Sequence, residues 1–313
     1  MGRYLVRCAG QLVVTGLGIL TVAFFLVRTI PGDPVLYMLG DFATPEGIAA
    51  LRAKLGLDRS LLEQFGLFIG HALTGDLGSS LVTGQPALTE VVSALPASLA
   101  LAVSGLAVAV ALGIPLGILS AVRQGSWVDL VVTVASLGGI SFPVFWLGLV
   151  GILVLAHWIP VFPALGASTT GDLASELHHL ALPALVLGLS VAAYISRLTR
   201  SAMLEVLGQD YVRVARAMGI PERRVIYRLA LRNALVPILA VVGVTFAWSL
   251  GNAILVEAVF SRPGLGSTLL KAIQSRDYQL VQAGVLVLAT GVVLVNVTLD
   301  VVYGLVDPRL RAT

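Results

Sequence analysis

Arginine is the residue type whose spacing most clearly indicates chemistry in this sequence. Residues 197–232 hold eight arginines and no lysine, so the other 277 residues share only twelve basic side chains. Arg224, Arg228 and Arg232 recur every four residues, which predicts one basic stripe along a helix. We interpret residues 197–232, called the arginine-rich segment below, as a docking element for a partner.

The local sequence predicts ordered structure for this segment. Ser201 to Met218 are mostly good helix formers, and Gly219 is a typical C-terminal stop. Pro221 suits the first turn of a second helix, and Glu222 beside it suits the positive end of the helix dipole. We therefore predict two short helices broken at residues 219–221.

The motifs of common enzymes are absent from the sequence. It contains no G-x-x-x-x-G-K-[ST] nucleotide loop, no G-x-S-x-G turn and no H-E-x-x-H helix. The four histidines lack zinc-site spacing, and the lone Cys8 excludes an internal disulfide. We predict no catalytic, cofactor-binding or metal-binding residue in this chain.

The composition indicates a membrane protein. Charged residues make up 12% of the chain, about half the roughly 25% of soluble domains, and hydrophobic residues make up 57%. The broken, basic helices could also resemble a DNA-binding helix-turn-helix. The apolar runs on both sides argue against that reading, so we expect no nucleic acid partner.

Six segments are apolar enough to span a bilayer, which predicts an all-α polytopic fold. They are residues 8–27, 97–122, 130–158, 177–196, 233–256 and 278–299. We read the first as a retained anchor, because it is longer than the apolar region of a signal peptide and no cleavage site follows. We read the third as one helix to about Trp158, with two helices separated at residues 138–139 as the alternative. Gly113 and Gly117 have the spacing of closely packed helices.

The predicted organisation has four parts. They are the first membrane helix (1–30), an external helical region (31–95), a core of five membrane helices (96–308) and a tail (309–313). In the external region, Pro45–Leu57 and Leu61–Leu73 mix apolar and polar residues as amphipathic helices do. This region could also be a solvated surface without a specific role.

The distribution of basic residues predicts the orientation. With six spans both termini lie on one side, and placing them in the cytoplasm puts thirteen of the twenty basic residues there. The arginine-rich segment is then cytoplasmic. The arginines could also anchor the chain beside anionic lipid.

The sequence of the loop after the fifth span also predicts local structure. Ser261 to Ser267 is rich in turn residues, and Thr268 to Ser275 could form a short surface helix. The loop could simply close the gap between two spans. Alternatively, it could meet a delivering partner through Arg262, Pro263, Gly264 and Gly266. We expect Glu257 and Asp300, near the ends of their spans, to cap helices or form hydrogen bonds there and not to relay protons.

Several motifs together resemble a known family. Asp210-Tyr-Val-Arg213-Val-Ala215-Arg-Ala217-Met-Gly219, followed by Leu229-Ala-Leu-Arg232-Asn-Ala-Leu-Val-Pro237, resembles the coupling-helix signature of ABC-importer permeases. The general signature is Glu-Ala-Ala, three residues, then Gly. Here only Ala215 and Gly219 match it, a departure typical of the peptide branch.

Further motifs extend the resemblance over nearly the whole chain. They are Ile30-Pro-Gly-Asp-Pro34, Leu55-Gly-Leu-Asp58, Gly75-Asp-Leu-Gly78, Ser141-Phe-Pro143, Phe145-Trp-Leu-Gly148, Val259-Phe-Ser-Arg-Pro-Gly-Leu-Gly266 and Asp307-Pro-Arg309. The sequence is thus similar to the first permease of dipeptide, oligopeptide and nickel importers.

The resemblance implies a type I ABC importer of five parts. This chain would pair with a second homologous permease, two ATP-binding cassette subunits and an external substrate-binding lipoprotein, within membrane lipid of a prokaryotic plasma membrane. ATP and Mg²⁺ would be bound by the ATPase subunits. The residues implied in ATPase coupling are Asp210, Tyr211, Arg213, Ala215, Arg216, Ala217, Gly219, Arg223 and Arg224. Di- and oligopeptides are the expected cargo.

Other readings stay open at this point. The same machinery could carry nickel or another small solute. An ion-coupled secondary transporter would need charged groups at mid-membrane, which the second, third and fourth spans lack. A membrane scaffold without transport activity would explain the spans but not their kinked, glycine-rich helices.

Overall fold

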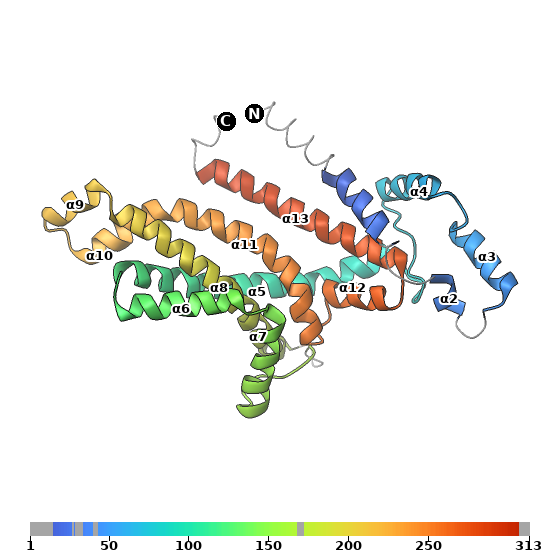
Figure 1. Cartoon of the computed structure of the whole chain (residues 1–313), viewed down its shortest axis with the longest axis horizontal. Coiled ribbons are helices and arrows are strands. Elements are labelled where there is room, and N and C mark those ends of the chain that lie inside the picture. The colour runs from blue at the N-terminus through green and yellow to red at the C-terminus, as the bar shows by residue number, and fades with distance from the viewer. Residues whose placement is uncertain (1–14, 27, 29–33, 40–42, 168–171, 307–313) are drawn as a thin grey trace. The chain divides into compact units, whose positions relative to one another are not determined.

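The protein is helical throughout its described parts in the computed structural model shown in Figure 1. The structure describes residues 15–26, 28, 34–39, 43–167 and 172–306. Within these ranges there is no β-strand, and Ser79 and Pro86 form an isolated antiparallel bridge. The all-α prediction is confirmed.

The chain divides into two compact units. The first comprises residues 1–97 and 263–294, and the second comprises residues 98–262 and 295–313. Residues 263–294, which the sequence analysis assigns to the membrane core, therefore pack with the N-terminal part of the chain. Two long helices, α5 (Ala87–Val122) and α13 (Tyr278–Val306), contribute residues to both units.

Short helices dominate the first unit. Apart from its shares of α5 and α13, it contains the helix Thr15–Leu26, α2 (Pro34–Leu39), α3 (Pro45–Leu55), α4 (Leu61–Leu73) and α12 (Leu265–Gln274). Thr44 caps α3, and Gly56 ends it in the left-handed conformation. Ser60 and Glu63 form a capping box at the start of α4. Both amphipathic helices predicted here are confirmed.

The core of the first unit joins segments far apart in sequence. Leu77, Val91, Leu269 and Val281 are among its buried members. The buried Asp277 adds a polar link, since Ser80 Oγ donates to Asp277 Oδ2 at 2.5 Å. The other carboxylate oxygen of Asp277 accepts the Leu280 N–H at 3.1 Å and so caps α13.

The second unit is made mainly of long helices. In addition to its shares of α5 and α13, it contains α6 (Trp127–Ser141), α7 (Val144–Ile152), the π-helix η2 (Leu153–Trp158), α8 (Leu173–Leu207), α9 (Asp210–Ala217), α10 (Glu222–Arg224), the π-helix η3 (Val225–Ala230) and α11 (Leu231–Val259). Pro183 and Pro237 lie inside α8 and α11.

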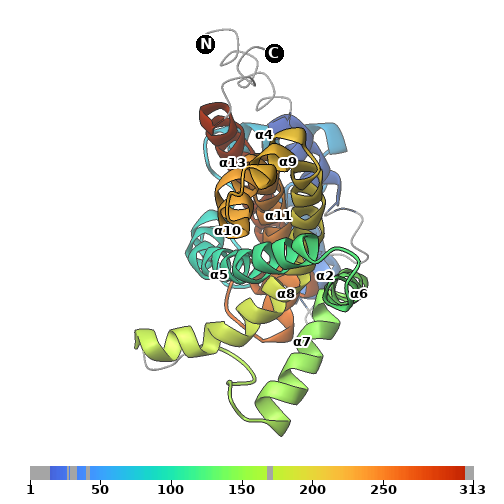
Figure 2. The same cartoon turned by 90° about the vertical axis from the view of Figure 1, so that its left-hand side faces the viewer.

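The third predicted span is not one helix. Helix α6 ends at Ser141, and α7 begins at Val144 after a bend of 102° (Figure 2). Pro143 lacks an N–H and disfavours helical geometry at the residue before it, so Phe142 is extended with φ −83° and ψ 131°. The prediction of a single helix to Trp158 was wrong, and the break lies at Pro143 and not at residues 138–139.

Glycines let α5 and α8 approach backbone to backbone. A Cβ added at Gly113 would lie 2.8 Å from the carbonyl oxygen of Ala192, and one at Gly117 would lie 2.5 Å from that of Ser196. A Cβ added at Gly188 on α8 would likewise lie 2.7 Å from the Gly105 carbonyl oxygen of α5. The close packing predicted from Gly113 and Gly117 is confirmed.

Four helices are long and apolar enough to cross a membrane. They are Ala87–Val122, Leu173–Leu207, Glu222–Val259 and Tyr278–Thr298, and the bent pair α6–α7 makes five if it counts as one span. The first predicted span is described only from residue 15, as the short apolar helix Thr15–Leu26. The structure therefore supports a multi-pass protein, with up to five of the six predicted spans among the described helices.

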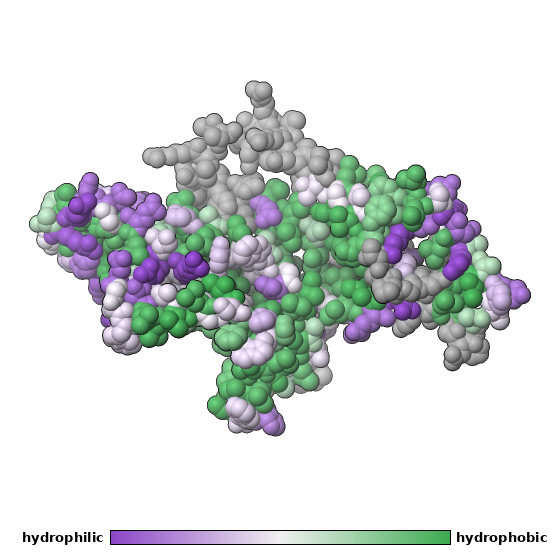
Figure 3. Space-filling model, viewed as in Figure 1, coloured by the Kyte–Doolittle hydropathy of each residue, from purple (hydrophilic) through white to green (hydrophobic). Residues whose placement is uncertain are grey.

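The surface of the second unit fits a membrane setting. Figure 3 shows hydrophobic residues over α7 and η2, where Phe145, Leu149 and Leu153 are exposed. Hydrophilic residues gather instead over α9 and α10. Exposed apolar area of this extent belongs against lipid or other subunits.

We predict that Gly117→Ala destabilises the protein by about 1–3 kcal/mol, because the new methyl group would overlap the Ser196 carbonyl. The matched control is Gly251→Ala on α11, where nothing lies within 4 Å of the added Cβ. Thermal unfolding in detergent measures both variants. Equal unfolding midpoints would contradict the close approach of α5 and α8.

Candidate functional site

The arginine-rich segment begins where α8 ends. Helix α8 continues through Arg197 and Arg200 to Leu207, and Gly208 and Gln209 separate it from α9. The continuous helix predicted from Ser201 to Met218 is therefore interrupted at residues 208–209. Asp210 lies in the first turn of α9, where a carboxylate favours the helix dipole.

The predicted break at Gly219 is present. Gly219 has φ +75°, and its N–H donates to the Arg216 carbonyl at 3.0 Å while the Ile220 N–H donates to that of Ala215 at 3.2 Å. Pro221 then leads into α10. Nothing lies within 4 Å of a Cβ added at Gly219, so this chain requires glycine there only for its backbone conformation.

The segment has a small core of its own. Val212, Ala215 and Val225 are buried together, and Ile220 and Leu229 pack against them. The side chain of Ala215 is only 6% exposed and contacts this core. The small size of Ala215 therefore allows α9 to pack on the residues after the turn.

The other predicted coupling residues lie on the outer side. Asp210, Tyr211, Arg213, Arg216, Ala217, Gly219, Arg223 and Arg224 are all exposed. Two apolar side chains that the sequence analysis did not select lie among them: Val214 is 56% exposed and Met218 is 75% exposed. Val214 and Met218 follow Tyr211 by three and seven residues, a spacing that places all three on one helix face. This spacing could have predicted an exposed apolar patch.

Two of the four predicted arginines already have partners in this chain. Arg216 donates two hydrogen bonds to the Glu222 carboxylate, at 2.7 and 3.2 Å, and these hydrogen bonds raise the pKa of Arg216. Arg213 pairs with Asp210 at 2.6 Å. Among the described residues, no side-chain hydrogen bond or ion pair engages Arg223 or Arg224, so these two cations are the ones available to a partner.

The Arg216–Glu222 pair also holds the turn. It links α9 to α10 across Gly219, so the two short helices keep one angle. A second link joins α9 to α11, because the Asn233 amide donates to the Tyr211 hydroxyl at 2.8 Å. The segment is therefore a shaped knob and not a free loop.

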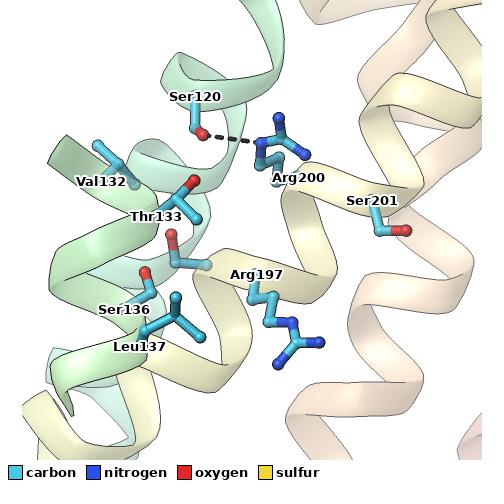
Figure 4. A pocket seen from close by; sticks show the side chains of 9 residues that line it. Ser120, Val132, Thr133, Ser136, Leu137, Arg197, Arg200 and Ser201 are labelled. Carbon is cyan, nitrogen blue, oxygen red and sulfur yellow. Dashed lines mark hydrogen bonds between the residues drawn. The ribbon is translucent and has the colours of Figure 1, made fainter. Parts of the chain in front are cut away.

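A buried ion pair anchors the part of α8 that precedes the knob. Arg200 on α8 donates to both carboxylate oxygens of Asp129 on α6, each at 2.7 Å. Ser120 on α5 also donates to Asp129 and accepts from Arg200 Nε at 3.1 Å (Figure 4). The Gly125 N–H completes the set at 3.0 Å. Three helices are thus joined through one carboxylate.

The sequence analysis missed this network. Its only local signal is an acidic residue in the first turn of an otherwise apolar helix, after the Ser126 N-cap. Such a carboxylate also suits the helix N-terminus, so the sequence gives no reason to assign it a distant partner. Figure 4 shows Arg200 beside a cavity of about 380 Å³ with hydroxyl groups from Ser120, Thr133 and Ser136 on its wall.

Comparison with known proteins identifies the family. Residues 113–312 match the family described as "Binding-protein-dependent transport system inner membrane component", and residues 1–102 match the N-terminal part of such components. The chain belongs to this family. It is therefore a permease subunit of an ABC importer, a multi-pass membrane protein and not the ATPase of the system.

Relatives of this permease match it from end to end. It is 41% identical to the "Dipeptide transport system permease protein DppB" of Escherichia coli K12, with 99% of each chain covered. It is 40% identical to the "Di/tripeptide transport system permease protein DppB" of Pseudomonas aeruginosa, again with 99% of each covered. The DppB of Alkalihalophilus pseudofirmus is 39% identical, over 99% of this permease and all of the relative.

The predicted binding-protein loop of the permease is mostly buried. Arg262, in the second unit, is only 6% exposed, and burial lowers the pKa of its guanidinium against the opposing effect of Glu176 and Glu257. Its Nε and Nη1 atoms have no hydrogen-bond partner among the described residues. In the first unit, Gly264 and Gly266 are buried and Pro263 is exposed. Pro263 is thus the one of these four residues that a partner could reach directly.

Glu257 does not lie free in its span. It is 1% exposed and accepts a hydrogen bond from Ser98 on α5. This agrees with the expected hydrogen-bonding role. Asp300 lies in α13, and its side chain is outside the described part of the structure.

We predict that Asp129→Asn destabilises the permease by about 2–3 kcal/mol. Loss of one partner from a buried pair costs about 3–5 kcal/mol, and water reaches Arg200, whose side chain is 30% exposed, so the effect is smaller. Asp210→Asn is the control, because its pair with Arg213 is exposed and worth at most about 1 kcal/mol. Unfolding midpoints in detergent compare them, and equal shifts would contradict the anchoring role of Asp129.

Proposed function

We propose that this permease forms, with a second homologous permease, the translocation pathway for di- and oligopeptides. An external substrate-binding lipoprotein delivers the peptide, and two ATP-binding cassette subunits bind ATP and Mg²⁺ and drive the cycle. The cargo is inferred from the names of the relatives, which are dipeptide and di/tripeptide permeases that match this chain over nearly their full length.

The observation that carries the proposal is the exposed face of the knob. Met218 and Val214 give it an apolar centre, and Arg223 and Arg224 add exposed cations with no side-chain partner in the described part of the chain. An apolar anchor with charges at its edge is the composition of a protein-docking surface. We assign this face to a groove of an ATPase subunit, with the arginines opposite carboxylates of that subunit.

The knob also has the stiffness that coupling requires. Its own core and the Arg216–Glu222 pair fix its shape, and α8 and η3 join it to the long helices. A force applied to α9 would therefore move α8 and α11 and would not be lost in a flexible loop. In this proposal, closure of the ATPase pair turns these helices from inward-facing to outward-facing.

The proposed orientation follows from the same assignment. The knob lies in the cytoplasm with both termini, and residues 31–95 lie outside. The excess of arginine in residues 197–232 supports this side.

Reconstituted transport tests the function. The permease, its partner permease, both ATPases and the binding protein are placed in liposomes, and uptake of a labelled dipeptide is followed. We expect uptake to require ATP and the binding protein and to persist when the proton gradient is dissipated. Uptake that collapses with the gradient while ATP is held constant would indicate a secondary transporter.

We predict that Gly219→Asp abolishes ATP-driven uptake while membrane insertion stays intact. The backbone at φ +75° disfavours a side chain, and since this chain leaves the added Cβ free space, the remaining loss must arise at the partner. Gly84→Asp is the matched control, with φ +72° and the same open surroundings in the first unit. Normal uptake by the Gly219 variant would contradict docking through this turn.

We also predict that Met218→Glu weakens binding of the ATPase subunits by at least tenfold. The change places a charge at the apolar centre of the docking face, where a buried anchor contributes about 2 kcal/mol or more. Leu62→Glu on α4 is the control, because it adds the same charge at an exposed leucine of the other unit. Co-purification and titration of the ATPase measure the effect, and unchanged affinity would move the docking face elsewhere.

A further inference from the structure

The first unit contains a polar pocket that the transport cycle described above does not use. It has a volume of about 220 Å³ and lies between the end of the first apolar helix, α4 and the start of α13. Its polar side chains are those of Arg28, Gln64, His71, Asp76, Tyr278, Gln279 and Gln282, and Phe24 and Phe68 supply apolar walls. All of these residues belong to one unit, so their placement depends on that unit alone.

Arg28 is a cation without a carboxylate partner among the described residues. Its guanidinium lies 3.4 Å from the centre of the Phe24 ring. It donates to the Phe24 carbonyl at 2.9 Å and to Gln64 Oε1 at 2.6 Å, and both acceptors are neutral. Arginine has five N–H donors, so several remain for an anion. The ring and the two oxygens hold the guanidinium in one orientation at the pocket.

The same pocket offers acceptors for a cation. Gln279 Oε1 is buried and has no hydrogen-bond partner among the described residues. An unsatisfied buried amide oxygen is costly, so this oxygen favours a ligand that can donate a hydrogen bond to it. Asp76 adds a carboxylate whose Oδ1 accepts the Gly78 N–H at 3.0 Å, and no ion pair neutralises it within the described residues.

Size limits the ligand. Drug-sized molecules occupy pockets of roughly 300–1,000 Å³, and this pocket is smaller. A ligand that fits must carry an anion and a hydrogen-bonding cation a few atoms apart, with a small apolar part against Phe24 and Phe68. Free amino acids and dipeptides have this chemistry.

We propose that this pocket is a site for a small zwitterion, in which Arg28 binds the carboxylate and Asp76 with Gln279 binds the ammonium group. The proposal rests on the residues of the first unit and not on the proposed function. The headgroup of an ethanolamine phospholipid also joins an anion to an ammonium group, and the experiment separates it from the free solute.

Equilibrium binding tests the site without transport. The complete importer is placed in phosphatidylglycerol nanodiscs without ATP and without the binding protein, and labelled L-alanyl-L-alanine is titrated. We expect saturable binding. N-acetyl-alanyl-alanine lacks the ammonium group and alanyl-alanine amide lacks the carboxylate, so each should compete at least tenfold more weakly. These analogues probe both ends of the ligand without a mutation.

Variants assign the binding to this pocket. Arg28→Gln should weaken dipeptide binding at least tenfold, whereas Arg59→Gln, which removes an exposed cation of the same unit outside this pocket, should leave it unchanged. Asp76→Asn should weaken it, with Asp58→Asn as its control. Unchanged unfolding midpoints and subunit content establish that the variants are folded.

Three results would overturn the proposal. One is the absence of saturable dipeptide binding, and another is equal binding by the wild type and Arg28→Gln, which would place the dipeptide elsewhere. The third is a phosphatidylethanolamine molecule retained in native mass spectrometry, lost in Arg28→Gln and not displaced by dipeptide. Failure of ATP-driven uptake would leave this test unaffected, because binding is measured without ATP.

Discussion

The close approach of α5 and α8 is the contact on which the second unit depends. Lipid is as apolar as leucine, so helices in a membrane gain little from burying leucine against each other and associate through backbone-close packing and hydrogen bonds. Gly113 and Gly117 bring α5 within van der Waals distance of the α8 carbonyls, and Gly188 does the same from α8. The approach then allows Ser120 on α5 to reach the Asp129–Arg200 pair. Close packing thus supplies the setting in which a charged pair can be buried.

Three buried or partly buried arginines differ in the partners of their guanidinium groups. Arg200 has a carboxylate with two well-placed hydrogen bonds, so it joins three helices. Within the described residues, Arg28 contacts neutral oxygens and an aromatic ring, and Arg262 is buried with Nε and Nη1 unpaired. Since an uncompensated charge is costly to bury, a paired arginine indicates structure, whereas an unpaired one indicates a role outside the isolated chain.

The residues of the knob fall into two groups, which are adjacent in the sequence motif. One group sets the shape of the knob and the other forms its surface. Ala215 and Val212 face the internal core, and Gly219 sets the turn, so these positions determine shape. Tyr211, Val214 and Met218 are exposed, as are Arg223 and Arg224, and in the proposed function they form the surface that meets the ATPase. Val212 and Ala215 tolerate few residues because they are buried in that core, and Gly219 does so because of its positive φ. Positions of the second kind can change together with the partner.

Much of this protein follows from the sequence by itself. Helical class, the apolar spans, α3 and α4, and the turn at Gly219 depend on local patterns such as apolar length, capping residues and glycine. The motifs likewise placed the chain in its permease family. The 102° bend at Pro143 was signalled by the proline but not located correctly, because prolines are also tolerated inside helices such as α8 and α11.

Only the tertiary structure decided which side chains meet. Asp129 and Arg200 are 71 residues apart, and Arg28 and Gln64 are 36 apart, so no local pattern links them. The inward face of Ala215 and the burial of Arg262 also depend on which helices pack against them. Local preference acts over one or two helical turns, whereas pairing and burial are set by contacts between segments distant in sequence.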